Sequence, residues 1–284
     1  MDLNRHKSGF VSIIGNPNVG KSTLVNALMG KDFSIITPKK QTTRHRILGL
    51  LNGENYQLVL SDTPGILKPE YEMQKAMISF VKESLIDADI LIYMTTVGET
   101  NIVDELILKK IQKTKIPLLV LINKIDISDQ GELEKDFKYW SKIFPRAEIF
   151  PISALTGFFI PELLKNLIEK IPESEPYFPK DQLSDKPERF FVNEAIRKSI
   201  LDNCYKEVPY AVEVITEEFK ESKKNIIINS TIIVERDTQK GIIIGSKGLK
   251  LKKIGTQARK YLEKFFEKKW RSKPNQLKKF GYKN

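Results

Sequence analysis

The stretch IGNPNVGKST, residues 14–23, decides how the first part of this 284-residue chain folds. It has the spacing Gly15-x-x-x-x-Gly20-Lys21-Ser22 between an apolar run and a helix-like segment. Glycines let backbone N–H groups wrap phosphates, the lysine reaches the β- and γ-phosphates, and the serine hydroxyl holds Mg²⁺. The stretch therefore predicts a P-loop for a nucleoside triphosphate. The residues that we expect to contact the nucleotide here are Gly15, Asn18, Val19, Gly20, Lys21, Ser22 and Thr23.

The tetrapeptide NKID, residues 123–126, follows the apolar run PLLVLI and indicates which base is bound. The Asp126 carboxylate can accept hydrogen bonds from N1–H and the 2-amino group of guanine. Adenine offers neither donor and would leave a buried carboxylate unpaired, which is a strong basis for its rejection. We expect Asn123 to tie loops together and Lys124 to cover the ring. A second strand-end turn can present a backbone N–H to guanine O6, and it consists of Ser153, Ala154 and Leu155.

Two further segments point to hydrolysis of GTP. DTPG, residues 62–65, ends the run YQLVL, so that Asp62 would hold Mg²⁺ through water and the Gly65 N–H would meet the γ-phosphate. Upstream, PKKQTTRHR puts Thr42 and Thr43 in a loop long enough to fold over the nucleotide. One of them should ligate Mg²⁺ when the γ-phosphate is present, which is how such loops order and release. Four motifs in this order predict a GTPase.

Five short apolar runs alternate with helix-like stretches in the first 170 residues: GFVSII, YQLVL, DILIYM, PLLVLIN and AEIFPIS. Such alternation is typical of a mainly parallel sheet with helices on both faces. In RILGLLNGENYQLVL, Asn52-Gly53 between apolar runs predicts a hairpin, and hence one antiparallel pair. We therefore expect an α/β domain over residues 1–170.

The sequence changes character at residue 171. Four prolines fall within IPESEPYFPKDQLSDKPE without hydrophobic periodicity, which is typical of a linker. A helix, two strands in YAVEVITEEF and NIIINSTIIVE, and a basic helix follow. The expected organisation is a nucleotide-binding domain (1–170), a linker (171–187) and a smaller α+β domain with a basic C-terminal tail (188–284).

The net charge of +11 lies in the last third of the chain. Residues 1–187 hold 24 Lys and Arg against 24 Asp and Glu, whereas residues 188–284 hold 23 against 12. Residues 240–284 alone hold 15 basic and 2 acidic side chains, a net charge of +13. Such a segment attracts polyanions, meaning nucleic acid or anionic lipid, and a solvated lysine-rich surface is the plain alternative.

Within this basic region, the tetrapeptide GSKG joins two helical segments. The arrangement resembles a type II KH domain, whose GxxG loop clamps the backbone of about four single-stranded nucleotides. The glycines permit close approach, and the side chains between them would meet phosphates, with more positive charge from the following helix. The expected RNA-binding residues are Gly245, Ser246, Lys247, Gly248, Lys250 and Lys253.

Residues 10–170 resemble a translation-factor-class bacterial GTPase, and QTTRHR together with DTPGI is similar to the Era family. A Ras-like P-loop domain followed by a KH domain is the architecture of that family, so the resemblance covers nearly the whole chain. It implies a GTP-hydrolysing switch that binds the 3′ end of 16S rRNA, assists assembly of the small (30S) ribosomal subunit, and associates peripherally with the inner membrane. We expect a cytoplasmic monomer with Mg²⁺ as its cofactor and GTP or GDP as its ligand.

The resemblance also implies how GTP is hydrolysed. Ras-like proteins carry a glutamine where this chain has Ile66, whose side chain cannot form hydrogen bonds. The family alternative is a K⁺ ion held partly by the P-loop asparagine, here Asn18, which supplies the positive charge that an arginine finger gives elsewhere. Thr43 matches the second threonine of the family motif, which favours it over Thr42 as the Mg²⁺ ligand. The expected catalytic residues are Asn18, Lys21, Thr43 and Gly65.

One departure from the family concerns the end of the chain. Era-type KH domains carry a further apolar strand after the GxxG helix, whereas this chain reads YLEKFFEKKWRSKPNQLKKFGYKN. The strand is missing or shortened by several residues. We predict a two-stranded sheet, or a helix that ends early and frees FFEKKW as a short strand.

Two other classes of function stay open at this stage. One is a GTP-regulated peripheral membrane protein whose basic C-terminal region meets anionic lipid. The other is an RNA-binding module whose nucleotide site does not turn over, against which the complete set of phosphate and metal ligands argues. The sequence shows neither a signal-peptide pattern nor an apolar run of membrane-spanning length, and its one cysteine, Cys204, cannot form an internal disulfide.

Overall fold

The computed structural model describes residues 5–101, 104–221 and 226–267. By its contacts the chain divides into two compact units, Met1–Asp185 and Lys186–Asn284. Each unit has its own core.

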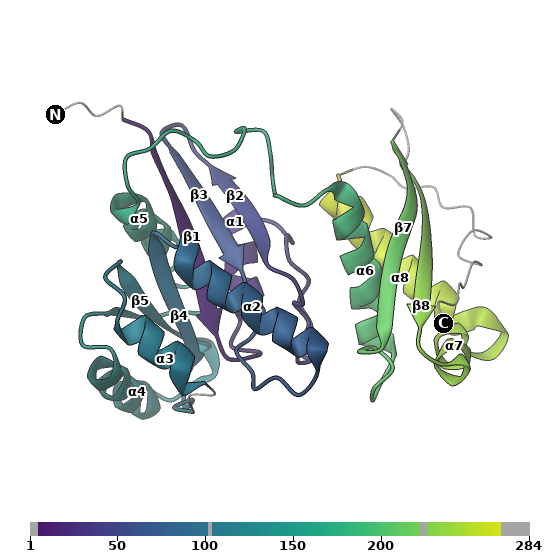
Figure 1. Cartoon of the computed structure of the whole chain (residues 1–284), viewed down its shortest axis with the longest axis horizontal. Helices are drawn as coiled ribbons and strands as arrows, with labels where there is room; N and C mark the ends of the chain where they lie inside the picture. The colour runs from purple at the N-terminus through teal and green to yellow at the C-terminus, as the bar shows by residue number, and fades with distance from the viewer. Residues whose placement is uncertain (1–4, 102–103, 222–225, 268–284) are drawn as a thin grey trace. The chain divides into compact units, whose positions relative to one another are not determined.

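A six-stranded sheet in the order β2-β3-β1-β4-β5-β6 forms the centre of the first unit (Figure 1). The strands are β1 (Lys7–Gly15), β2 (Ile47–Asn52), β3 (Tyr56–Asp62), β4 (Ile90–Thr96), β5 (Leu118–Asn123) and β6 (Glu148–Pro151). Only the β2–β3 pair is antiparallel. The α/β fold predicted from the alternating apolar runs, with its single hairpin pair, is confirmed.

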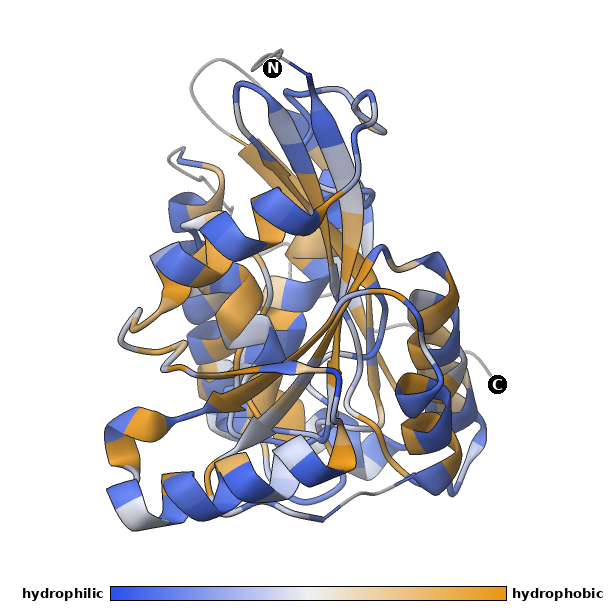
Figure 2. Ribbon diagram, turned by 90° about the vertical axis from the view of Figure 1, so that its left-hand side faces the viewer, coloured by the Kyte–Doolittle hydropathy of each residue, from blue (hydrophilic) through white to orange (hydrophobic). Residues whose placement is uncertain are grey.

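Helices cover both faces of this sheet. They are α1 (Lys21–Met29), α2 (Glu72–Asp87), α3 (Glu105–Gln112), α4 (Gln130–Ile143) and α5 (Ile160–Lys170), with the short 3₁₀ helix η1 (Ile125–Ile127). Val81 of α2, Ile107 of α3 and Trp140 of α4 share one core cluster with the sheet, whereas α1 contacts α5 on the other face. Figure 2 shows the apolar strands between helices whose outer surfaces are polar. Since β1 lies between β3 and β4, its carboxyl end opens into the crevice where open α/β sheets bind ligands.

Residues 172–185, which fall in the predicted linker, lie against the first unit. Ser8 N donates to Pro172 O (3.1 Å), and Leu50 N of β2 donates to Leu183 O (3.0 Å). The fully buried Gln57 amide donates to Phe178 O (2.8 Å) and accepts from the N–H groups of residues 177 and 178. Backbone groups at the edge of the sheet are thereby satisfied, so this segment is ordered despite its three prolines.

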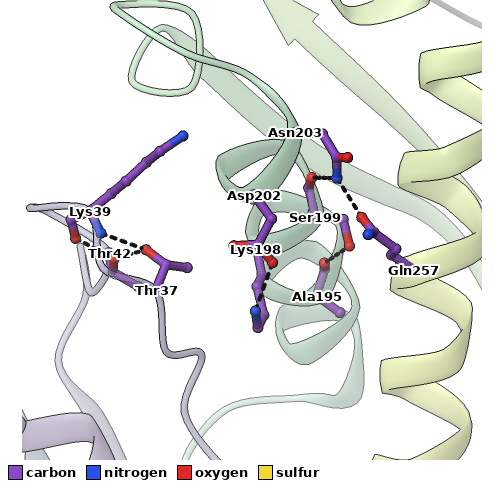
Figure 3. Close-up of polar contacts among 9 residues, drawn as sticks. All are labelled: Thr37, Lys39, Thr42, Ala195, Lys198, Ser199, Asp202, Asn203 and Gln257. Atoms are coloured by element: carbon purple, nitrogen blue, oxygen red, sulfur yellow. Dashed lines mark hydrogen bonds and ion pairs between the residues drawn. The ribbon is translucent and has the colours of Figure 1, made fainter.

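The second unit packs helices on a hairpin. Its elements are α6 (Glu188–Asn203), β7 (Val212–Glu221), β8 (Ile226–Val234), α7 (Asp237–Ile244), the 3₁₀ helix η2 (Ser246–Gly248) and α8 (Leu249–Phe265). β7 and β8 pair antiparallel, and Ile196, Ile228 and Ile254 meet in the core. The Asn203 side chain of α6 also donates to Gln257 of α8 (Figure 3). This is the α+β architecture that the sequence predicts.

The end of α8 bears on the predicted loss of a strand. Among residues 186–267, apart from 222–225, the sheet of this unit has two strands. α8 ends at Phe265, the first residue of FFEKKW, and the Phe265 ring stacks on that of Phe191 with centroids 4.9 Å apart. The alternative of a short strand within FFEKKW stays a prediction. The aromatic packing of Phe265 and Phe266 on the core holds the last helical turn in place. The rest of that segment lies outside the described residues.

No helix in the described part of the chain is long and apolar enough to cross a membrane.

Candidate functional site

The P-loop joins the buried end of β1 to the start of α1. Asn18 and Gly20 both have positive φ, 65° and 104°. A Cβ atom at Gly20 would also collide with the Asn123 amide, and one at Gly65 would lie 2.7 Å from the Pro17 Cα. Glycine is therefore required at both positions, because the DTPG and NKID segments are packed directly against the loop.

Lys21 is the first residue of α1 and is 6% exposed. Its Nζ donates to the carbonyl O atoms of Gly15 (3.1 Å) and Asn16 (2.8 Å). Burial lowers the pKa of this ammonium group to about 8, while the nearby Asp62 and Glu99 carboxylates act to raise it. The loop thus holds a buried cation at the N-terminus of a helix, an arrangement suited to phosphate.

Three oxygen-bearing side chains belong to the same site: Ser22, Thr43 and Asp62. Ser22 Oγ and Thr43 Oγ1 share a hydrogen bond of 3.0 Å, and Asp62 is fully buried at the end of β3, close enough to Lys21 to influence its pKa. Thr42 points elsewhere, because its Oγ1 bonds to Thr37 Oγ1 (2.6 Å) and to Lys39 O (2.7 Å), as Figure 3 shows. Of the two threonines, Thr43 is therefore the one beside the P-loop. Hydroxyl and carboxylate oxygens are the ligands that Mg²⁺ prefers.

The NKID and SAL segments meet at the carboxyl ends of β5 and β6. Asn123 Nδ2 donates to Val19 O of the P-loop (2.8 Å), and its Oδ1 accepts from Ala154 N (2.9 Å). Ser153 Oγ donates to Asp126 Oδ1 (2.6 Å), which orients the carboxylate. Lys124 has a φ of 66° and Leu155 is 79% exposed. Asn123 therefore ties three loops together, as its place in the motif predicts.

A pocket of about 540 Å³ opens beside the P-loop, and its lining includes Lys124 of NKID but neither Asp126 nor residues 153–155. The P-loop, Thr42, Thr43, Thr63, Gly65 and Lys124 line it, together with five residues that sequence reasoning missed: Ile35, Ile36, Thr37, Pro38 and Gln41. These residues belong to the loop between α1 and β2. The length of that loop was the one feature of the sequence that could have pointed to them. Pro38 O accepts from Asn18 Nδ2 (3.1 Å), so this loop touches the P-loop. Ile66, in the place of a glutamine, is 3% exposed and packs in the core.

The second candidate site is the GSKG loop. Gly245, Lys247 and Gly248 all have positive φ (68°, 49° and 74°), and the turn links α7 to α8. Ser246, Lys247 and Lys253 are exposed, and Lys250 is half-buried. Two exposed apolar side chains missed by sequence reasoning flank the loop: Ile242, 42% exposed, and Leu249, 65% exposed. The loop thus presents backbone, cations and apolar surface together, as single-stranded RNA requires.

Comparisons with known proteins cover both units. Residues 10–124 match the family model described as 50S ribosome-binding GTPase, and residues 207–271 match that of the KH domain. The chain is 40% identical to the GTPase Era of Clostridium kluyveri, over 98% of this chain and 99% of the relative. It is 42% identical to the GTPase Era of Syntrophus aciditrophicus, over 97% and 95%.

Two solved structures are similar over nearly their whole length. A crystal structure of Era in complex with MgGDPNP and nucleotides 1506–1542 of 16S ribosomal RNA superposes with a TM-score of 0.87 at 38% identity, covering 94% of this chain and 91% of that one. A variant of Aquifex aeolicus Era bound to GDP·AlF₄⁻ gives the same TM-score and identity, covering 93% and 91%.

Proposed function

Because the chain belongs to the Era family of GTP-hydrolysing enzymes, we propose that it is a GTP-controlled switch that binds the 3′ end of 16S rRNA and assists assembly of the 30S subunit. One observation carries the proposal: a braced nucleotide pocket and an exposed GxxG loop occur in the same chain. We assign the GTPase domain to residues 1–170, joined through 171–187 to an RNA-binding domain over 188–284.

At the nucleotide site, one set of protein groups binds the phosphates and another binds the base. Lys21 and the P-loop N–H groups hold the phosphates, and Asp126, oriented by Ser153, reads guanine. Mg²⁺ fits this site because Ser22 and Thr43 already converge and the buried Asp62 carboxylate offers a second-sphere acceptor. Mg²⁺ bound there neutralises charge on the phosphate oxygens.

In this chain, backbone groups and the loops that carry Thr43 and Gly65 position the water molecule that attacks GTP. The Ile66 side chain packs in the core, whereas Thr43 and Gly65 line the nucleotide pocket and are the groups that we assign to this role. We assign a K⁺ site to Asn18, whose Nδ2 is held by Pro38 O, so that Oδ1 is the atom for the cation. Activity that rises with K⁺ and not with Na⁺ at constant ionic strength would support this assignment.

RNA is a better fit than lipid to the basic region. Lipid docking needs an apolar helix face opposite lysines. In α8 that face, represented by Ile254, Ala258 and Leu262, is buried in the core of its own unit, whereas Lys247 and Lys253 are exposed. We therefore propose a cytoplasmic monomer, with peripheral association at the inner membrane as a secondary property of the net charge of +13 in residues 240–284.

The test is RNA affinity in two nucleotide states. Fluorescence anisotropy with an oligonucleotide that matches the 3′ end of 16S rRNA is measured at fixed salt, with protein loaded with a non-hydrolysable GTP analogue or with GDP. We expect tighter, sequence-selective binding in the GTP form. Lys247→Glu should weaken binding by at least about tenfold, while Lys206→Glu, an equal charge change outside the loop, should have little effect. Equal, non-selective binding in both states would refute the switch, and vesicles of anionic lipid would then be tested.

A further inference from the structure

Asn16, the second residue of the P-loop, has a buried side chain that takes no part in the roles assigned above. It is 6% exposed, and its Nδ2 donates to Glu99 Oε1 (2.7 Å) and to the Asn101 carbonyl O (2.8 Å). Both partners lie in the loop between β4 and α3. A flipped amide would set Oδ1 against two acceptors, so only the donor-inward orientation fits. These hydrogen bonds tie the P-loop to the loop between β4 and α3, which belongs to none of the four GTPase motifs.

Glu99 is itself held in place. Its N–H donates to Thr96 O (3.0 Å), its carbonyl O accepts from Thr95 Oγ1 (3.1 Å), and Thr96 Oγ1 donates to its Oε2 (3.3 Å). Both threonines belong to the end of β4. The carboxylate is therefore fixed by the sheet and forms a charge-assisted hydrogen bond to Asn16, the stronger kind of hydrogen bond.

The loop that carries Glu99 is also fastened to the rest of the site. Val97 N donates to Asn123 O at the end of β5 (3.2 Å), and Gly98 N donates to Asp136 Oδ2 (2.7 Å). Asp136 is 4% exposed on α4. The loop is therefore anchored to β5 and α4, and it meets Asn16 of the P-loop through the Glu99 carboxylate and the Asn101 carbonyl O.

Packing does not replace this link. An open depression of about 530 Å³ separates residues 17–19 of the P-loop from residues 96–101. The Asn16 backbone also matters, because its carbonyl O is one of two acceptors for the Lys21 ammonium group. Displacement of the Asn16 peptide would move an acceptor of the buried cation.

We propose that Glu99 is a positioning residue that holds the P-loop in its phosphate-binding conformation through Asn16. The inference rests on the nucleotide site assigned under Proposed function. Glu99 does not contact the nucleotide in this scheme, and the cost of its loss falls on binding. GDP and GTP should be weakened equally, because both need the same loop conformation, while turnover at saturating GTP is preserved.

The experiment measures dissociation constants for fluorescent GDP and a fluorescent GTP analogue, and kcat at saturating GTP, on the full chain. Glu99→Ala should weaken both nucleotides by about tenfold, the equivalent of one charge-assisted hydrogen bond, with kcat within about twofold of the parent. Glu99→Gln keeps an acceptor for Asn16 Nδ2 and should recover most of the affinity. Glu105→Ala, at an exposed position on α3, is the matched control and should change nothing.

A double-mutant cycle separates the link from a general loss of stability. Asn16→Ala also loses the hydrogen bond to Asn101 O, so it should weaken GDP at least as much as Glu99→Ala does. The two changes combined should weaken GDP no more than Asn16→Ala alone, whereas independent effects would multiply, adding about a further tenfold. Unchanged affinity in Glu99→Ala, or multiplied effects in the double variant, would overturn the proposal. Lys21→Ala tests the site itself: if it too left GDP binding intact, the assigned site would be at fault and not the role of Glu99.

Discussion

The P-loop and the GSKG loop both put glycines and a lysine before a helix, but they are held in opposite ways. Around the P-loop, the Asn123 amide, Gly65 and the Asn16 side chain brace the backbone from three sides. Around the GSKG loop, a Cβ at Gly245 would lie 2.7 Å from Lys250 Cβ, but one at Gly248 would meet nothing within 4 Å, and Lys247 is exposed. The P-loop is thus a buried cradle, meaning a loop whose backbone is held by neighbouring groups, whereas the GSKG loop has an exposed Lys247 and open space beside Gly248.

The difference follows from the ligands. A nucleoside triphosphate is small and highly charged, so several N–H groups must converge on it, and that convergence has to be built before the ligand arrives. An RNA chain is long and gives many weak contacts, each of which depends little on the exact position of one group. Single changes should therefore be severe at the first loop and mild at the second.

The largest effect should come from the two lysines. Lys21→Ala removes a cation that is fixed by two carbonyl groups, and we expect kcat/KM for GTP to fall by at least about a hundredfold. Lys247→Ala removes one exposed cation and should lower RNA affinity by less than about tenfold. Phosphate-release kinetics and RNA anisotropy on both variants make the comparison, and comparable losses would show that the GSKG loop is also a braced cradle.

The same contrast can be made with glycine. Gly20→Ala adds a methyl group at a φ of 104° that collides with the Asn123 amide, so it should destabilise the protein by about 3 kcal/mol and abolish micromolar GDP binding. Gly248→Ala, at a φ of 74° in open space, should cost about 1 kcal/mol and change RNA affinity less than about threefold. Urea denaturation and ligand titration give both numbers. Equal unfolding costs at the two positions would contradict the difference in bracing.

Much of this comparison could be predicted from the sequence, and the rest depends on folding. The alternating apolar runs indicated the fold class. Motif spacing indicated the expected nucleotide contacts, because phosphate chemistry demands particular residue types at fixed spacing. Asn16 and Glu99 could not be found in that way: they are 83 residues apart and meet only because β1 and β4 are neighbours. Likewise, no feature of the proline-rich segment 171–187 predicts that the Gln57 amide forms hydrogen bonds with its backbone. Partners of a buried amide depend on strand order, which local patterns do not contain.

Salt should distinguish the two sites further. The combined change of Lys247, Lys250 and Lys253 to alanine should reduce the slope of log affinity for single-stranded RNA against log salt by about 2, since each phosphate that is no longer neutralised lowers it by about 0.7. GDP affinity in the same variant should stay within about twofold at every salt concentration. An unchanged RNA slope would place the RNA contacts elsewhere in the basic region.

The effect most specific to the P-loop is the dependence of stability on pH. Burial lowers the pKa of Lys21 to about 8, against 10.5 for an ordinary lysine. The folded protein therefore releases this proton above pH 8 while the unfolded chain keeps it to about 10.5. The penalty for burying the charge is present in full below pH 8 and is relieved between pH 8 and 10.5, so this group raises the stability of the nucleotide-free protein as pH rises.

Nucleotide binding should respond with the opposite sign. Phosphates favour the charged lysine, so GDP binding above pH 8 must take up a proton, and affinity should be about tenfold weaker at pH 9 than at pH 7. Titrations of fluorescent GDP across this range measure the effect, with RNA affinity over the same range as the control for general damage. Glu99 raises the Lys21 pKa, so Glu99→Ala should move the midpoint to lower pH. A GDP affinity independent of pH would mean that Lys21 stays charged in the free protein and that the cradle is less closed than its hydrogen bonds indicate.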